Sequence, residues 1–166
     1  MNSPGFDPRL FLTAQESDFV RALTEIRNGK KLSHWMWYVF PQIAGIPELH
    51  GHRASSTSRL YALADLGAAC SYLAEPVLGS RYVEILRAAV GHITASGTPR
   101  FGAVIALFGS VDAAKFVSSL TLFERAAAEL PGDDAAAVID LAREVFGGGD
   151  IRRCSDTESI LGAATG

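Results

Sequence analysis

Apolar residues recur mainly three, four and seven positions apart along this chain, which is the spacing of amphipathic helices. The first such stripe, Phe19, Leu23 and Ile26, follows the capping-box pattern of Thr13 and Glu16. It predicts a helix over residues 14–28 behind an N-terminal arm of residues 1–10. Later stripes with their caps and stops predict helices from Asp65 to Leu73, from Pro76 to Val90, from Thr98–Pro99 to Gly109, from Asp112 to Pro131, from Asp133 to Gly147 and from Ser155 onward.

Residues 33–42, which we call the tryptophan segment, hold both tryptophans of the chain and one of its four histidines. Ser33 is placed to cap a short helix through residue 40, and Pro41 ends it because the residue before a proline leaves the helical region. This helix is apolar on nearly every side, so we expect it to be buried.

Between residues 43 and 58 the helical pattern is lost, and a cluster of Gly, Pro, Ser and Thr predicts an exposed loop. Residues 60–63 fit a short strand and a helical turn equally well. No repeat, low-complexity tract or linker divides the 166 residues, and this length suits one domain with one core. The predicted fold class is all-α, with a single compact multihelical domain over residues 11–166.

Composition narrows the classes of function. The net charge is −3 and the only basic pairs are Lys30–Lys31 and Arg152–Arg153, which disfavours long DNA or RNA as a partner but permits a small phosphorylated ligand. The longest apolar run, residues 101–108, is too short to span a bilayer, so no membrane partner is expected. The lack of a signal-like N-terminus and the two distant cysteines predict a cytoplasmic protein with reduced thiols.

The tryptophan segment offers a first group of candidate site residues. If helical geometry runs back to Lys31, then Lys31, His34 and Tyr38 share one face. Imidazole titrates near neutrality, so such a group could transfer protons. The structural alternative is a histidine whose ring nitrogens only satisfy buried carbonyls.

A second group lies at the predicted helix that begins near Asp112. There Asp112, Lys115 and Ser119 follow one edge of the apolar stripe, next to Ser118 and Thr121, and such margins are where pockets form. The alternative is an ordinary ion pair three residues apart, with hydroxyls that bond to the preceding turn.

Metal and cofactor motifs are weak. Glu48, His50 and His52 alternate as zinc ligands can, but no further ligand is indicated and the run lies in the predicted loop, so no metal is expected. Neither a phosphate-binding glycine loop nor a nucleophile elbow occurs, and no cofactor is expected.

The chain contains four distinctive stretches: Gly29-x-Lys31-x-Ser33-His34-Trp35-Met36-Trp37-Tyr38-x-Phe40-Pro41-Gln42, Tyr61-Ala62, Tyr72-Leu73-x-x-Pro76-Val77-Leu78-Gly79-x-Arg81, and Phe108-Gly109-Ser110-x-Asp112-x-x-Lys115-x-x-Ser118-Ser119-x-Thr121-Leu122-Phe123. Together they resemble one bacterial family, the domain of unknown function 1810 family, sometimes labelled calpastatin. The resemblance runs from about residue 11 to residue 161 and implies a compact multihelical domain without an established reaction. This sequence departs from the family pattern at Leu120, Glu75 and Ala113, and an insertion covers about residues 46–53.

Our leading hypothesis is a small-molecule hydrolase or transferase for a nucleotide or ADP-ribose-type ligand. Phosphates would meet lysines and helix N-termini, and rings would stack on tryptophan. The proposed catalytic residues are His34, Asp112 and Lys31, and the proposed ligand-binding residues are Trp35, Trp37, Tyr38, Lys115, Ser118, Ser119 and Thr121. The competing hypothesis is a non-catalytic interaction module in which these residues form a buried polar network.

Overall fold

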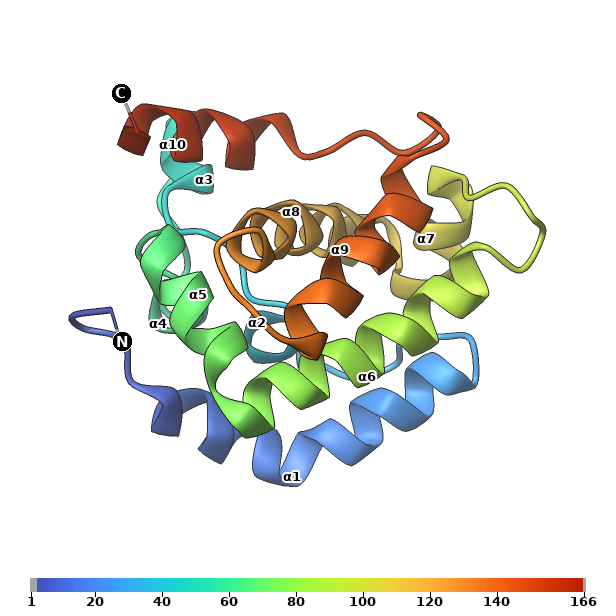
Figure 1. The fold of residues 1–166 in the computed structure, drawn as a ribbon, viewed down its shortest axis with the longest axis horizontal. Coiled ribbons are helices and arrows are strands. Elements are labelled where there is room, and N and C mark those ends of the chain that lie inside the picture. Colours follow the sequence, from blue (N-terminus) through green and yellow to red (C-terminus); the bar gives the residue numbers. More distant parts are fainter. Residues whose placement is uncertain (1–2, 166) are drawn as a thin grey trace.

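The computed structural model describes residues 3–165, and this part of the chain folds into ten helices and one isolated parallel bridge between Ile43 and Leu63 (Figure 1). The predicted all-α class is therefore confirmed. The helices are α1 (Pro8–Arg27), α2 (Met36–Val39), α3 (Ile46–Leu49), α4 (Ser56–Tyr61), α5 (Leu66–Ala74), α6 (Pro76–Ile93), α7 (Phe101–Phe108), α8 (Ser110–Ala127), α9 (Asp133–Phe146) and α10 (Ser155–Thr165).

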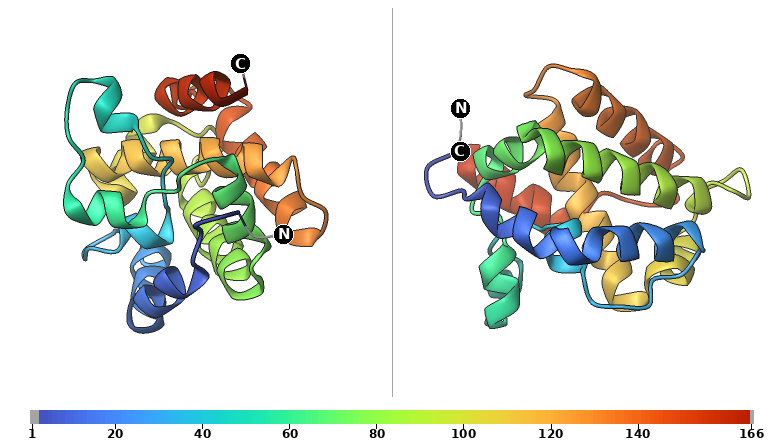
Figure 2. Two further views of the ribbon diagram at one scale, coloured as in Figure 1. Left: turned by 90° about the vertical axis from the view of Figure 1, so that its left-hand side faces the viewer. Right: turned by 90° about the horizontal axis from the view of Figure 1, so that it is seen from below.

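Helix α8 lies at the centre of the fold and packs against α5, α7, α9 and α10. Helix α6 packs against α1, α5, α7 and α9, so α6 and α8 have α5, α7 and α9 as common neighbours (Figures 1 and 2). Because every long helix contacts one of these two, the chain has one core and forms a single domain.

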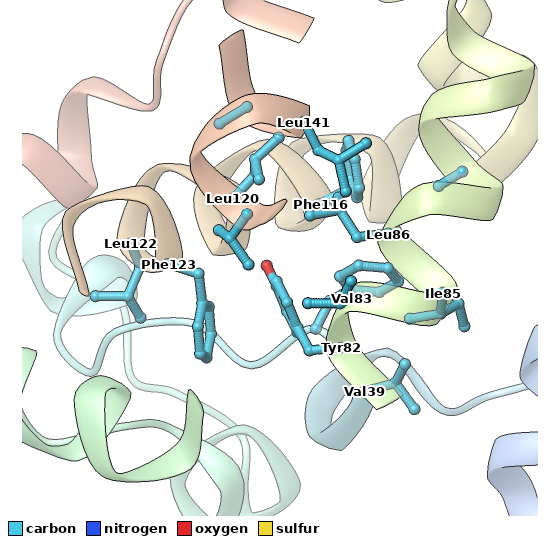
Figure 3. Close-up of a cluster of buried hydrophobic side chains, with 14 of the residues drawn as sticks. Val39, Tyr82, Val83, Ile85, Leu86, Phe116, Leu120, Leu122, Phe123 and Leu141 are labelled. Atoms are coloured by element: carbon cyan, nitrogen blue, oxygen red, sulfur yellow. The ribbon is translucent and has the colours of Figure 1, made fainter. Parts of the chain in front are cut away.

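Aromatic rings fill the space between α6 and α8. The Tyr82 side chain rises from α6 toward α8 and stacks on Phe123, with 4.3 Å between ring centroids (Figure 3). Phe40 of the tryptophan segment meets the rings of Tyr82 and Phe116 edge-on at 5.5 and 5.3 Å. Edge-to-face pairs of this kind add to the stabilisation from burial. The tryptophan segment is therefore part of the core, as its apolar pattern predicts.

The N-terminal boundary differs from the prediction. Helix α1 begins at Pro8, because Asp7 accepts the N–H of Arg9 at 3.0 Å and proline fits the first helical turn. Residues 8–10 thus belong to the helix, and the arm is shorter than residues 1–10. The capping-box pattern at Thr13 lies inside α1 and caps nothing.

The helix of the tryptophan segment is shorter than predicted. It covers only Met36–Val39, and Ser33 does not cap it, because the Ser33 hydroxyl donates to Glu25 instead. Residues 31–35 are not helical, so the predicted common face of Lys31, His34 and Tyr38 is wrong.

The predicted loop over residues 43–58 contains two short helices, α3 and the start of α4, where Ser55 accepts the N–H of Ser58 at 3.1 Å. Residues 60 and 61 end α4, whereas Leu63 pairs with Ile43, so this ambiguous stretch is partly helical and partly extended. Such short helices depend on caps and tertiary contacts and leave no periodic pattern.

From residue 65 onward the prediction agrees with the structure to within a few residues. Asp65 caps α5 by accepting the N–H of Ala68 at 2.7 Å, and Pro76 occupies the first turn of α6, as expected. Helix α7 begins two residues after Pro99, α8 begins two residues before Asp112, and Gly132 takes the N-cap of α9 in place of Asp133.

One buried carboxylate fixes the start of the tryptophan segment. Glu25 of α1 is 8% exposed, and its Oε1 accepts the N–H groups of Leu32 (2.8 Å) and Ser33 (3.0 Å) and the indole N–H of Trp35 (2.9 Å). The Ser33 hydroxyl donates to Oε2 at 2.5 Å. Burial by itself raises the pKa of the Glu25 carboxyl, but these four hydrogen bonds outweigh it and hold the pKa at about 2, against an ordinary value of 4.5.

The other end of the segment is held by the same helix. The amide of Gln15, 1% exposed, donates to the Tyr38 carbonyl at 2.7 Å and to the Tyr72 hydroxyl at 2.8 Å. The Tyr38 hydroxyl donates to Asp18. Burial and the neighbouring Asp18 carboxylate both raise the pKa of Tyr38, so it stays a neutral donor. Helix α1 therefore positions the segment through three polar side chains.

Substituting Glu25 with Gln should lower the free energy of unfolding at pH 7 by about 3 kcal/mol, since a neutral amide cannot accept from all four donors. The folded-state pKa lies below the unfolded one, so the carboxylate contributes fully above about pH 4.5 and loses its contribution as the pH falls toward 2. Urea unfolding at several pH values measures this difference between wild type and Glu25→Gln.

Glu16→Gln is the matched control, because Glu16 is exposed on the same helix. It should change the free energy of unfolding by no more than about 0.5 kcal/mol. Equal losses in the two variants, or a Glu25 deficit that does not shrink toward pH 2, would contradict the role given to the Glu25 carboxylate.

Candidate functional site

A cavity of about 590 Å³ lies beside the tryptophan segment, on the side of the chain where α3 and α4 project from the central helices (Figure 2, left). Its floor is held by two backbone hydrogen bonds, from Leu63 to the Gln42 carbonyl (2.9 Å) and from Ala44 to the Leu63 carbonyl (2.8 Å). The cavity is lined by Trp37, Gln42, Ile43, Ala44, Gly45, Ile46, Pro47, Glu48, Ala54, Ser58, Arg59, Tyr61, Ala62, Ala64 and Lys115.

Few polar groups line this largely apolar cavity, and two of them are cations. The Lys115 ammonium lies 5.2 Å from the centroid of the Trp37 ring and 3.6 Å from Asp112 Oδ1. Arg59 supplies a second positive charge from α4. Glu48 is the carboxylate of the lining, and its Oε1 also accepts the N–H of Ala54 at 3.4 Å. A largely apolar lining with two cations and one carboxylate suits a ligand that has an apolar body and an anionic group.

Asp112 also forms a second, largely buried ion pair. Lys31 Nζ is 2.8 Å from Asp112 Oδ2, and the two side chains are only 7% and 20% exposed. The same ammonium donates to the Ser33 carbonyl at 2.5 Å and lies 5.0 Å from the Trp35 ring centroid. Asp112 thus bridges Lys31 and Lys115, and this bridge joins the tryptophan segment to α8.

His34 stands apart from these residues. It is exposed, it does not line the cavity, and its recorded hydrogen bond is through its backbone carbonyl, which the Tyr38 hydroxyl approaches at 3.4 Å. The structure therefore brings together Lys31, Asp112 and Lys115 of the predicted site residues and leaves His34 on the surface.

The three predicted hydroxyl ligands of α8 are buried and bonded to other segments of the fold. Each is at most 1% exposed. Ser118 bonds to the Thr157 hydroxyl of α10 (2.9 Å), and Ser119 bonds to the Tyr82 hydroxyl of α6 (3.1 Å). The Thr121 hydroxyl donates to the Val117 carbonyl one turn earlier in α8 (2.7 Å) and accepts the N–H of Cys154, just before α10 (2.9 Å). In this structure these hydroxyls join helices and face no cavity.

Of the three predicted aromatic ligand-binding residues, two are buried and one lines the cavity. Trp35 is 1% exposed and bonded to Glu25, and Tyr38 is 8% exposed and bonded to Asp18. Trp37 alone of these three lines the cavity. Together with Lys115, it is the part of the predicted ligand-binding set that faces open space.

Sequence reasoning missed most of the lining, because it comes from the region predicted as a loop. Gln42, Arg59 and Tyr61 belong to no periodic pattern. Helix α3 and the residues after it form one wall, and His50 ties that wall to Asp156 of α10 at 2.8 Å. No spacing along the sequence signals such a contact across 106 residues.

Comparison with known proteins agrees with the resemblance seen in the sequence. The crystal structure of the conserved hypothetical protein Rv1873 from Mycobacterium tuberculosis is similar to this one, with a TM-score of 0.72 and 30% identity over 95% of this chain and 97% of that chain. No curated protein matches. The family model described as "Protein of unknown function (DUF1810)" matches residues 5–152. Since that match covers most of the 166 residues, the chain belongs to the DUF1810 family.

Proposed function

We propose that the cavity beside Trp37 binds a small anionic molecule with a planar ring, of the nucleotide or ADP-ribose type. The observation that carries this proposal is the Lys115 ammonium held 5.2 Å from the Trp37 ring centroid at the wall of a largely apolar cavity. A cation and an aromatic surface side by side offer contacts to both parts of such a ligand.

Charge supports an anionic ligand. Asp112 carries one negative charge between two lysines, so the Lys31, Asp112 and Lys115 group keeps one net positive charge. Lys31 is closed to solvent, whereas the Lys115 side chain is 28% exposed and lines the cavity. The excess charge is therefore available on the cavity side, where the lining also holds one further cation, Arg59, and one carboxylate, Glu48.

Size and apolar lining support a ligand with a ring system. A volume of about 590 Å³ lies in the range of drug-sized ligand sites, which is roughly 300–1,000 Å³. Tyr61 and Trp37 supply aromatic surface, and Ile43 and Ile46 supply aliphatic surface. A ligand ring would lie against these walls while its anionic group meets Lys115 or Arg59.

The proposal covers binding and leaves out the proton transfer that the sequence suggested. His34 and Asp112 were the expected proton shuttles for hydrolysis or group transfer, and neither lines the cavity. Both Asp112 oxygens also face lysine ammonium groups, which favours a fixed structural role.

A non-catalytic interaction module is the second candidate. The largely buried Lys31–Asp112 pair favours it, because a buried polar network is what that hypothesis expects. The two candidates differ in whether a small molecule enters the cavity, which the following measurement decides.

Lys115→Met should weaken binding of ADP-ribose, NAD or ATP about tenfold, because it removes the charge while keeping a chain of similar length. Isothermal titration calorimetry measures the affinity, and a thermal shift with each ligand identifies which one binds. Arg125→Met is the matched control, since Arg125 is exposed on the same helix and does not line the cavity. If none of the three ligands raises the melting temperature of the wild type, the interaction module is favoured. Equal ligand affinity in Lys115→Met and Arg125→Met would contradict the proposed contact between Lys115 and the ligand.

His34→Ala should leave ligand affinity unchanged and alter the free energy of unfolding by no more than about 0.5 kcal/mol, because the side chain is exposed and outside the cavity. The same calorimetry and urea unfolding measure both quantities. A loss of affinity in this variant with unchanged stability would restore His34 to the site.

A further inference from the structure

Helix α7 has no polar side chain, yet one of its faces is open. Its sequence is Phe-Gly-Ala-Val-Ile-Ala-Leu-Phe, and Val104, Leu107 and Phe108 point into the core. Phe101 and Ile105, one turn apart, are each 39% exposed. A helix that is apolar on every side is normally buried on every side, so the exposure of this face is unusual for its composition.

Two more large apolar side chains extend this face. Val111, in the first turn of α8, is 70% exposed, and Leu32 is 74% exposed. The N–H of Lys31 donates to the Leu107 carbonyl at 2.8 Å, which places Leu32 beside the C-terminal turn of α7. The segment after α1 and helix α7 lie at the same end of the molecule (Figures 1 and 2). We call Leu32, Phe101, Ile105 and Val111 the α7 patch.

The segments that carry the patch contain no acidic residue. Residues 26–47 and residues 85–111 hold no Asp or Glu, although the chain as a whole has 18 acids and a net charge of −3. Within them, Lys30 and Arg100 are exposed and flank the patch in sequence. The nearest acid in the chain, Asp112, is paired with Lys31. A basic margin around an apolar centre is complementary to a surface that is both apolar and anionic.

The shape of the corner favours a deformable surface as the partner. The axes of α7 and α8 are bent by 114° relative to one another at Gly109, whose φ of +84° permits the sharp turn. The patch lines none of the cavities of about 590, 520 and 150 Å³ in the described part of the chain. A peptide strand binds along a sheet edge, which these ten helices do not offer, whereas docking on a membrane surface needs no preformed groove.

We propose that the α7 patch docks on an anionic phospholipid membrane surface, with its four apolar side chains at the headgroup boundary and Lys30 and Arg100 near lipid phosphates. Interfacial binding of this kind combines buried apolar area with attraction to anionic lipids. No single helix over the described residues is long and apolar enough to cross a membrane. The α7–α8 pair reaches that length only together, and it is sharply bent with α8 buried in the core. The proposed contact is therefore at the membrane surface. The sequence predicts no membrane partner because it has no spanning segment, and a surface contact requires none.

Co-sedimentation with vesicles tests this proposal on the full chain. We expect binding to vesicles of phosphatidylcholine mixed with phosphatidylglycerol, weakening as salt is added, and much weaker binding to phosphatidylcholine alone. Val111→Gln should reduce the partition coefficient roughly fivefold, because it removes one apolar side chain from the interface without a change of charge. Val20→Gln is the matched control, since Val20 is 74% exposed on α1 and outside the patch.

Circular dichroism and thermal melting of each variant establish that the fold is intact. Wild-type binding that is reduced in Val111→Gln and retained in Val20→Gln supports the proposal. Three results would overturn it: no binding to the mixed vesicles at low salt, equal reduction in the two variants, or a concentration-dependent dimer that Val111→Gln dissociates, which would make a second copy of the chain the cover of the patch.

Discussion

The carboxylate of Glu25 is the contact on which the rest of the site depends. A charge that is 8% exposed persists only if its desolvation is offset, and four donors from residues 32–35 offset it. Since two of these donors are backbone N–H groups, the carboxylate fixes the path of the chain as well as side-chain positions. That path turns Trp35 into the core and places the Lys31 ammonium beside α8.

Paired charges connect the tryptophan segment, positioned in this way, to the cavity. Lys31 fixes Asp112, Asp112 in turn approaches Lys115, and Lys115 lies over the Trp37 ring at the cavity. Each of these contacts is worth little in isolation at a surface, but partial burial and mutual support strengthen them. The Glu25 contacts and the Lys31–Asp112 pair therefore position Lys115 and Trp37, which a ligand in the cavity would meet.

The helices were predictable from sequence where periodicity and caps agree, as at Asp65 and Pro76. The cap prediction for Ser33 is wrong because its hydroxyl has two possible partners, a backbone N–H donor at the start of the next helix and a carboxylate acceptor eight residues earlier, and only tertiary structure selects between them. Glu25 did leave a signal, since it falls on the apolar stripe of α1 between Ala22 and Ile26. A charged residue at a core position indicates a buried partner, although its partner cannot be read from spacing. Apart from Trp37 and Lys115, most of the cavity lining had no periodic signal because it comes from short, irregular elements.

The wall of the cavity that the sequence left unpredicted also depends on the C-terminal helix. His50, at the end of α3, contacts Asp156 of α10, and α10 is held on α8 by the Ser118–Thr157 hydrogen bond. The Arg153–Glu124 ion pair at 2.6 Å holds the segment just before α10 on the same helix. Helix α10 lies beyond the residues that the family model matches. One side of the cavity, with Trp37 and Lys115, thus depends on the tryptophan segment and α8, and the opposite side depends on the contact between α3 and α10.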